Sequence, residues 1–197
     1  MILNHVTEMM FLEQYQVLLD VVRQQYASVV WTHKIQEKQA DIYFKRYNCL
    51  ETVNIVFASL TSCGIVSTIL GGELCAKIIT MALSFVTLAI TAYYKSFDLK
   101  SIGYQNKVSA NEFLAIRNRL LRIIADIHIH RKSCEEIEED VSRVMEALDH
   151  LYIHAAQTTD GAVKMAMKSL KEREEYTYSN EEIDQFLPPQ LRGRIDS

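Results

Sequence analysis

Two long apolar runs, separated by a short polar turn, dominate the hydropathy pattern of the chain. Residues 52–72 are twenty-one consecutive positions without a charged side chain, and a helix of that length just spans a hydrocarbon core of about 30 Å. Residues 78–94 are seventeen further uncharged positions, and Lys77 can extend this run by placing its ammonium at the membrane interface. The pattern therefore predicts two membrane-spanning helices.

The residues between the two runs predict a tight reversal of the chain. Gly71 and Gly72, followed by Glu73, leave room only for the turn of an antiparallel helical hairpin, and glycine readily takes the positive φ that such a turn needs. Two buried helices at the centre of a soluble bundle are the alternative, since a helix apolar all round is found in both settings. Soluble core helices, however, seldom exceed about twenty residues without a charge.

The basic residues indicate an orientation for this hairpin. Of the twenty-one Lys and Arg residues, all but Lys77 lie outside residues 52–94. Because Lys and Arg concentrate on the cytoplasmic side of membrane proteins, we expect both termini in the cytoplasm and the glycine turn on the opposite side.

Helical spacing continues on both sides of the hairpin. Residues 8–30 predict an amphipathic helix, and Trp31 opens a second stretch that runs into the first apolar run. After the hairpin, the spacing predicts a second cytoplasmic helical pair that packs on the N-terminal helices. A turn at residues 158–161 precedes a helix near residues 162–175, and Ser179 with Glu182 fits a capping box for a short helix ending at Phe186.

With six Gly and two adjacent Pro near the C-terminus, little in the chain interrupts a helix. The predicted fold is all-α: a two-transmembrane helical hairpin with a cytoplasmic helical bundle built from both terminal regions. Residues 1–50 are the cytoplasmic N-terminal helices, 51–94 the hairpin, and 95–197 the cytoplasmic C-terminal helices and tail.

The charge distribution limits the possible partners. A net charge of −4 argues against general nucleic-acid binding, which favours a basic excess. Residues 95–132 carry eight Lys or Arg against three acids, whereas residues 133–150 carry seven acids against one Arg. The basic half can face anionic lipid head groups and the acidic half a basic partner, although a charge run is more often only a solvated face.

Candidate chemistry is sparse. The sequence has no phosphate-binding glycine loop, nucleophile elbow or other catalytic motif, so we expect no enzymatic activity and no cofactor. His150 and His154 lie one helical turn apart, and His128 and His130 form a second pair, but no third ligand follows at metal-binding spacing. We therefore interpret these histidines as surface residues. The four cysteines have no paired ligand spacing and are interpreted as free thiols.

The second apolar run carries a polar stripe that is a candidate pore lining. Its five residues recur at steps of three and four, which places them within an arc of about 80° on one helix face. They are Lys77, Thr80, Ser84, Thr87 and Thr91. The alternative is that these hydroxyls donate to their own helix or to a neighbouring helix and serve only packing.

The first apolar run carries a row of small residues suited to close helix contact, namely Ser59, Cys63 and Ser67. Two helices cannot enclose a channel by themselves. If a pore forms, several copies must assemble, with the polar stripe inward and the small-residue row against neighbouring helices.

Four stretches resemble the SLATT family of two-transmembrane effectors, which are associated with nucleotide-sensing and nucleotide-synthesising modules. They are WTHKIQEKQADIYFKRY, FASLTSCGIVSTI, SFDLKS and EEIDQFLPPQLR, in this order along the chain. The resemblance covers residues 31–192 and follows the order of pre-membrane helix, hairpin, long cytoplasmic helix and acidic-proline tail.

This resemblance implies a prokaryotic inner-membrane effector of an antiphage or conflict system, which assembles and breaches the membrane when a partner signals infection. The partner it implies is a reverse transcriptase, or a nucleotidyltransferase or its nucleotide product. The sequence leaves two functions open: a homo-oligomeric pore, or a membrane-anchored scaffold whose cytoplasmic helices recruit a partner protein.

Overall fold

The computed structural model describes the chain except residues 1, 70, 72, 177–178 and 187–197, and at 2–12, 67–68, 180–181 and 184 it describes the backbone alone. Helices make up the regular structure of the described chain, as predicted, and no strand occurs there. They are α1 (Ile2–Ile69), α2 (Leu74–Phe97), α3 (Leu99–His128), α4 (Cys134–His154), α5 (Asp160–Met167), the π-helical turn η1 (Lys168–Glu172) and α6 (Asn180–Phe186).

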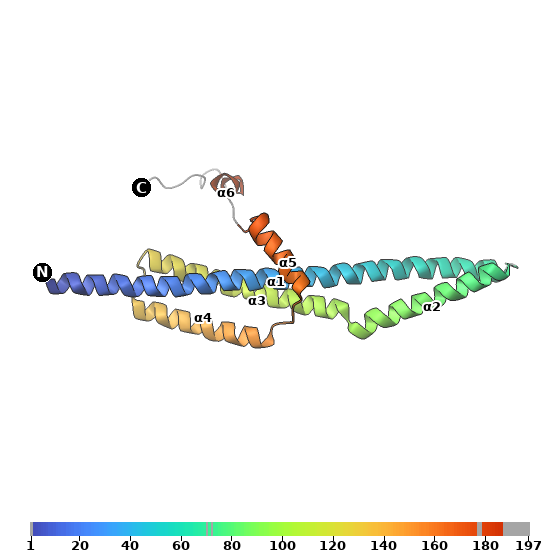
Figure 1. Cartoon of the computed structure of the whole chain (residues 1–197), viewed down its shortest axis with the longest axis horizontal. Coiled ribbons are helices and arrows are strands. Elements are labelled where there is room, and N and C mark those ends of the chain that lie inside the picture. The colour runs from blue at the N-terminus through green and yellow to red at the C-terminus, as the bar shows by residue number, and fades with distance from the viewer. Residues whose placement is uncertain (1, 70, 72, 177–178, 187–197) are drawn as a thin grey trace.

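Helix α1 is a single rod that runs the length of the molecule (Figure 1). Its 68 residues correspond to a length of about 100 Å. The predicted boundary at Trp31 is wrong, because the helix continues without interruption from the N-terminal stripe into the first apolar run. No Pro or Gly occurs in α1 before Gly64, so nothing in the chemistry of the backbone ends a helix at Trp31.

Helices α2 and α3 return along α1 in the opposite direction (Figure 1). The reversal is made at the predicted glycine turn, where Gly71 has a φ of 97°. Asp98 separates α2 from α3: its φ of 40° is left-handed, and its carboxylate accepts a hydrogen bond from the Ser101 backbone N–H at 3.3 Å. One residue therefore ends α2 and caps the start of α3, and the chain changes direction there.

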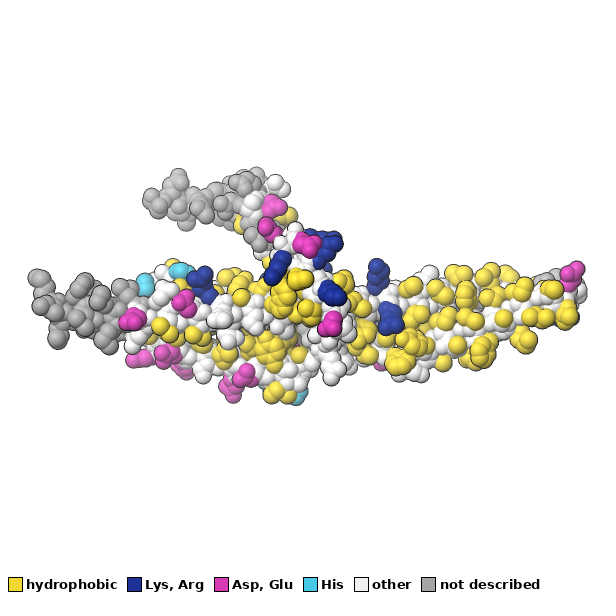
Figure 2. Space-filling model, viewed as in Figure 1, with side chains coloured by type: hydrophobic (Ala, Val, Ile, Leu, Met, Phe, Trp, Pro, Cys, Tyr) yellow, Lys and Arg dark blue, Asp and Glu magenta, His cyan; other side chains and the backbone are white. Residues whose placement is uncertain are grey.

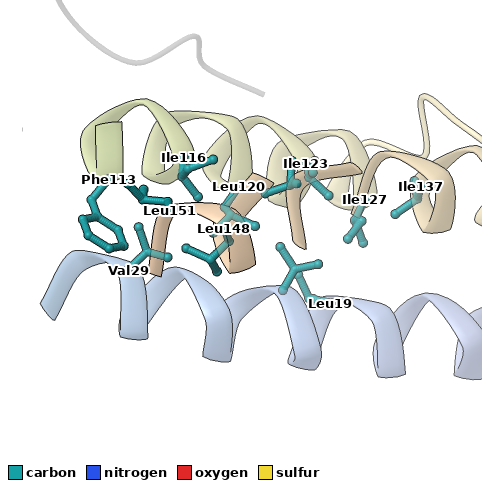
Figure 3. Close-up of a cluster of buried hydrophobic side chains, with 12 residues drawn as sticks. Leu19, Val29, Phe113, Ile116, Leu120, Ile123, Ile127, Ile137, Leu148 and Leu151 are labelled. Atoms are coloured by element: carbon teal, nitrogen blue, oxygen red, sulfur yellow. The ribbon is translucent and has the colours of Figure 1, made fainter. Parts of the chain in front are cut away.

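The hydrophobic core lies between α1, α3 and α4, away from the hairpin (Figure 3). Phe113 and Leu120 of α3, Leu148 of α4 and Val29 of α1 are nearly or completely excluded from solvent. Ser133 and Glu136 cap the N-terminus of α4 through a reciprocal capping box. The predicted packing of a second helical pair on the N-terminal helix is confirmed.

The C-terminal elements follow the predicted order with one difference. The helix predicted near residues 162–175 is shorter: α5 ends at Met167, and the chain continues as η1 to Glu172. Beyond it, the predicted capping box is present, because the Ser179 N–H donates to Glu182 Oε2 at 2.8 Å and the Glu182 N–H donates to Ser179 Oγ at 3.3 Å. Helix α6 ends at Phe186, as expected.

Candidate functional site

The outer surface of the hairpin is apolar and is not covered by the rest of the chain. Figure 2 shows hydrophobic side chains over this half of the molecule and charged side chains mainly over the other half. Ile69, Leu74 and Phe85 are 78%, 72% and 73% exposed, and α2 has no buried residue. Both helices are long and apolar enough to cross a membrane. The alternative of two helices buried in a soluble bundle does not fit this surface.

The polar stripe of α2 faces α1 along part of its length. Thr80, Thr87 and Thr91 are half-buried, whereas Lys77 and Ser84 are exposed. The hydroxyls of Thr80, Ser84 and Thr87 donate to backbone carbonyls of their own helix at 2.8 to 3.0 Å. Hydroxyl groups in this arrangement need no outside partner, so the stripe fits the packing alternative in this conformation. Pore lining stays a prediction.

Two contacts bring the hairpin helices together. The Thr91 hydroxyl donates to Asn54 Oδ1 at 3.0 Å. Further along, α1 and α2 approach so closely that a Cβ placed on Gly64 would lie 2.1 Å from Thr80 Oγ1. Glycine at position 64 therefore permits the spacing of the two helices.

The other hairpin residues singled out from the sequence lie elsewhere. Ser59 and Cys63 are exposed on α1, so they are accessible to a neighbouring molecule. The side chain of Ser67, and Gly72, lie outside the described residues.

A buried ionic and aromatic cluster joins the middle of α1 to the segment that follows η1. We call this cluster the junction; it comprises His33, Lys34 and Glu37 of α1 with Glu175 and Tyr176. Lys34 is only 4% exposed. Its ammonium lies 2.8 Å from Glu37 Oε2 and 2.5 Å from Glu175 Oε2, so one buried cation holds two carboxylates.

Tyr176 fills the centre of the junction. Its ring stacks on His33 with centroids 5.6 Å apart and an angle of 17°. Its hydroxyl donates to Glu37 Oε2 at 3.2 Å and lies 3.1 Å from His33 Nδ1. Since the hydroxyl has one proton, His33 must donate from Nδ1. Two cations also lie over the ring, because Lys34 Nζ and the guanidinium carbon of Arg117 are 4.6 and 4.9 Å from its centroid.

The surroundings of the junction shift its ionisation. Burial lowers the pKa of His33 to about 4, although the Glu37 carboxylate opposes this, so the imidazole is neutral at pH 7. Burial of Lys34 disfavours its charge, but the hydrogen bonds to Glu175 and Glu37 outweigh burial and raise the pKa of Lys34. Burial likewise disfavours the charge of Glu37, but Lys34 outweighs it and lowers the pKa of Glu37. The hydrogen bond from Lys34 lowers the pKa of Glu175. The ion pairs of the junction are therefore charged at neutral pH.

Buried glutamines fix the α4–α5 connection next to the junction. Gln36 Nε2 donates to the Ala156 carbonyl at 2.7 Å, and Gln39 Oε1 accepts from the backbone N–H of Thr159 at 2.8 Å. The middle of α1 thus anchors both the connection that leads into α5 and the segment that leaves η1.

The sequence did not reveal the junction. Helical spacing puts Lys34 and Glu37 on a charged face of the helix that precedes the membrane segment, and no local pattern distinguishes Tyr176. The spacing of His33, Gln36 and Gln39 is a usable signal. These polar residues recur at steps of three among the charged residues, so the polar face of this helix is large enough to pack against a second element.

The histidine pairs do not gather further metal ligands. The rings of His150 and His154 are 4.4 Å apart, and His130 stands edge-on to Tyr15 at 4.9 Å. No group of three or more His, Cys, Asp or Glu side chains occurs among the residues whose side chains are described.

The protein consists of an apolar helical hairpin, which the rest of the chain does not cover, and a helical bundle with its own core. This architecture is that of a membrane-hairpin protein. The chain belongs to the SMODS and SLOG-associating 2TM effector domain family 4, whose model matches residues 18–182. The resemblance to the SLATT family is thereby confirmed. No curated protein and no solved structure matches the chain. The protein is a membrane effector of the kind associated with conflict systems.

Proposed function

We propose that the protein assembles in the inner membrane and, on activation, forms a pore that disrupts it. Both termini lie in the cytoplasm and the hairpin crosses the bilayer twice. The concentration of Lys and Arg outside residues 52–94 supports this orientation. In a defence setting, ion leakage through the pore stops the infected cell.

The uncovered surface of the hairpin is the observation that carries this proposal. Two helices cannot enclose a channel, so a pore needs several hairpins. The exposed residues Ser59 and Cys63 suit close contact between neighbouring copies, because small side chains let helix backbones approach in lipid.

Opening requires the stripe of α2 to leave α1 and face the pore. The hydroxyls of Thr80, Ser84 and Thr87 already donate within α2, so rotation of the helix leaves these hydrogen bonds intact. The hydrogen bond from Thr91 to Asn54 must break, and such bonds between membrane helices contribute only about 0.6 kcal/mol on average. A rigid α1, shared by bundle and hairpin, can transmit a change in the bundle to the membrane.

The test uses the full chain in liposomes and in cells with its activating system. Because Thr80 packs closely against Gly64, the hydroxyls are removed by near-isosteric changes: Thr80→Val, Ser84→Ala, Thr87→Val and Thr91→Val together. We expect loss of ion flux and of depolarisation, with membrane insertion retained. Ser62→Ala is the matched control, because it removes an exposed hydroxyl of α1 that donates only to the Ala58 carbonyl of its own helix and lies off the small-residue row. Undiminished flux from the quadruple variant would refute the pore lining.

A membrane-anchored scaffold is the second candidate, and the surface of α4 favours it. Acidic residues are exposed along this helix, including Glu135, Glu138 and Glu146, and Ile153 is exposed at its end. Such a surface suits a basic partner, for which a reverse transcriptase or a nucleotidyltransferase remains the expectation. Partner binding without ion flux is the outcome that selects the scaffold.

A further inference from the structure

A groove lies where the bundle meets the hairpin, between α1 and α5. Its volume is about 430 Å³, and its lining is largely apolar but includes two basic side chains. The lining residues are Asp41, Ile42, Lys45, Arg46, Cys49, Leu50 and Met165.

The groove is on the face of α1 that points away from α2 and α3. Tyr47, on the opposite face, meets Tyr94 of α2 and lies under the ammonium of Lys100. At 100° per residue, Lys45, Arg46 and Cys49 lie well away from Tyr47 around the helix. Helix α5 forms the other wall, since Ala162 and Ala166 are fully buried and Met165 lines the groove while 43% exposed.

The depth of the groove matches the lipid head-group layer. Arg46 and Lys45 precede Thr52, the first residue of the uncharged run, by six and seven positions, which is roughly 10 Å along a helix. The head-group layer extends some 5–7 Å beyond the hydrocarbon core on each side. The long side chains of Lys45 and Arg46 can span the remaining distance between their backbone and the head-group layer, and so place their charges at the level of the lipid phosphates.

The two cations of the groove have no carboxylate partner. Within the described part of the chain, no Asp or Glu oxygen lies at ion-pair distance from Lys45 or Arg46, whereas Lys38 lies 3.9 Å from Asp41 and 3.7 Å from Glu175. The one acid in the lining, Asp41, thus already faces Lys38. Two exposed, uncompensated cations beside an apolar wall match a molecule with an anionic head and a hydrocarbon tail.

We propose that this groove binds an anionic phospholipid of the cytoplasmic leaflet. The head-group phosphate lies between Lys45 and Arg46, and the first methylenes of an acyl chain lie against Leu50 and Met165. The inference rests on the membrane orientation of the proposed function. The inference adds a specific ligand to the proposed function. The bound lipid bridges α1 and α5, so the placement of α5 depends on the lipid composition of the leaflet.

The experiment measures lipid retention by native mass spectrometry of the full chain, purified in detergent and titrated with phosphatidylglycerol or phosphatidylcholine. We expect the wild type to retain phosphatidylglycerol preferentially. Lys45→Gln with Arg46→Gln should weaken that retention roughly thirtyfold, given the usual contribution of two juxtamembrane cations. Lys95→Gln with Lys100→Gln removes the same charge near the membrane on the other side of α1 and is the matched control.

A second variant keeps the charges and narrows the groove. Cys49→Trp places an indole in the apolar lining and should lower phosphatidylglycerol retention while Lys45 and Arg46 remain. Inorganic phosphate, added in the same molar excess as the lipid, should not displace bound phosphatidylglycerol. Equal retention of both lipids, equal loss in the two charge variants, or displacement by phosphate would overturn the site. Membrane insertion and ion flux are measured separately, so the lipid site can fail while the pore stands, and the reverse.

Discussion

The ammonium of Lys34, in the middle of the longest helix, lies 2.5 Å from a carboxylate oxygen of Glu175, which follows η1. This ion pair joins two segments that are far apart in the sequence. It fixes the chain just after η1 to α1, the helix that also forms the first half of the membrane hairpin. The contact therefore lies on the same continuous helix as the first membrane segment.

Replacing Lys34 by Met should destabilise the protein by about 2 kcal/mol, because Glu37 and Glu175 lose the buried cation that they share, while Lys38 and Lys107 stay within 4.0 Å of these partly exposed carboxylates. Thermal unfolding of the detergent-purified protein measures the loss, and trypsin should release the segment beyond η1 faster than in the wild type. Lys164→Met, at an exposed position of α5, is the control. Equal unfolding temperatures for the two variants would contradict a stabilising junction.

His33 should make the stability of the bundle depend on pH. Burial lowers the pKa of His33 to about 4, whereas the unfolded chain has the ordinary value near 6.5. Between these values the unfolded state binds a proton that the folded state does not, so stability is complete above about pH 6.5 and falls as the pH drops toward 4. The pKa values of Glu37 and Glu175 are lowered in the folded protein, so these carboxylates stabilise it at neutral pH. That contribution is lost only below about pH 4.5, where they begin to protonate in the unfolded chain.

The variant His33→Phe keeps an aromatic ring against Tyr176 but cannot titrate. Unfolding temperatures measured between pH 7 and pH 5 should fall for the wild type and change less for this variant. Parallel curves over that range would show that protonation of His33 does not control the stability of the junction.

The parts of the structure that sequence reasoning predicted are those encoded locally. The hairpin follows from two uncharged runs, its turn from Gly71, and the start of α6 from Ser179 and Glu182, which lie three residues apart. Each of these signals is complete within a few residues or one helix. The single long α1 was divided at Trp31 because the apolar stripe changes there, but a change of stripe alters what a helix packs against and does not end the helix.

The junction could not be predicted in the same way. Helical periodicity places Lys34 and Glu37 on one face but does not say whether water or another segment covers that face. The covering residues, Glu175 and Tyr176, lie beyond a helix whose end was predicted too late in the chain. Likewise, helical spacing puts the hydroxyls of α2 on one face, but the half-burial of Thr80, Thr87 and Thr91 depends on the partner helix.

Gly64 should tolerate no side chain. A Cβ at this position would lie 2.1 Å from Thr80 Oγ1 and 3.1 Å from both Cβ and Cγ2 of Thr80, so rotation of the threonine can move its hydroxyl away but leaves its Cβ closer than an ordinary contact. We expect Gly64→Ala to destabilise the hairpin by about 1–3 kcal/mol, the usual effect of overpacking. Adding Thr80→Ala should restore part of this stability, since it removes the nearest atom. Unfolding in detergent measures both effects, and an unchanged Gly64→Ala protein would contradict the close approach of the helices.

The hydrogen bond from Thr91 to Asn54 can be measured by a double-mutant cycle. Thr91→Val and Asn54→Leu each remove one partner, and the coupling free energy between them should be about 0.6 kcal/mol, the average for hydrogen bonds between membrane helices. Thr87→Val is the control, because the Thr87 hydroxyl donates to the Leu83 carbonyl of its own helix and should show no coupling to Asn54. Equal coupling from both threonines would mean that the two helices do not share this bond. A small coupling at Thr91 alone would fit an α2 that can turn its hydroxyl stripe away from α1 when the pore opens.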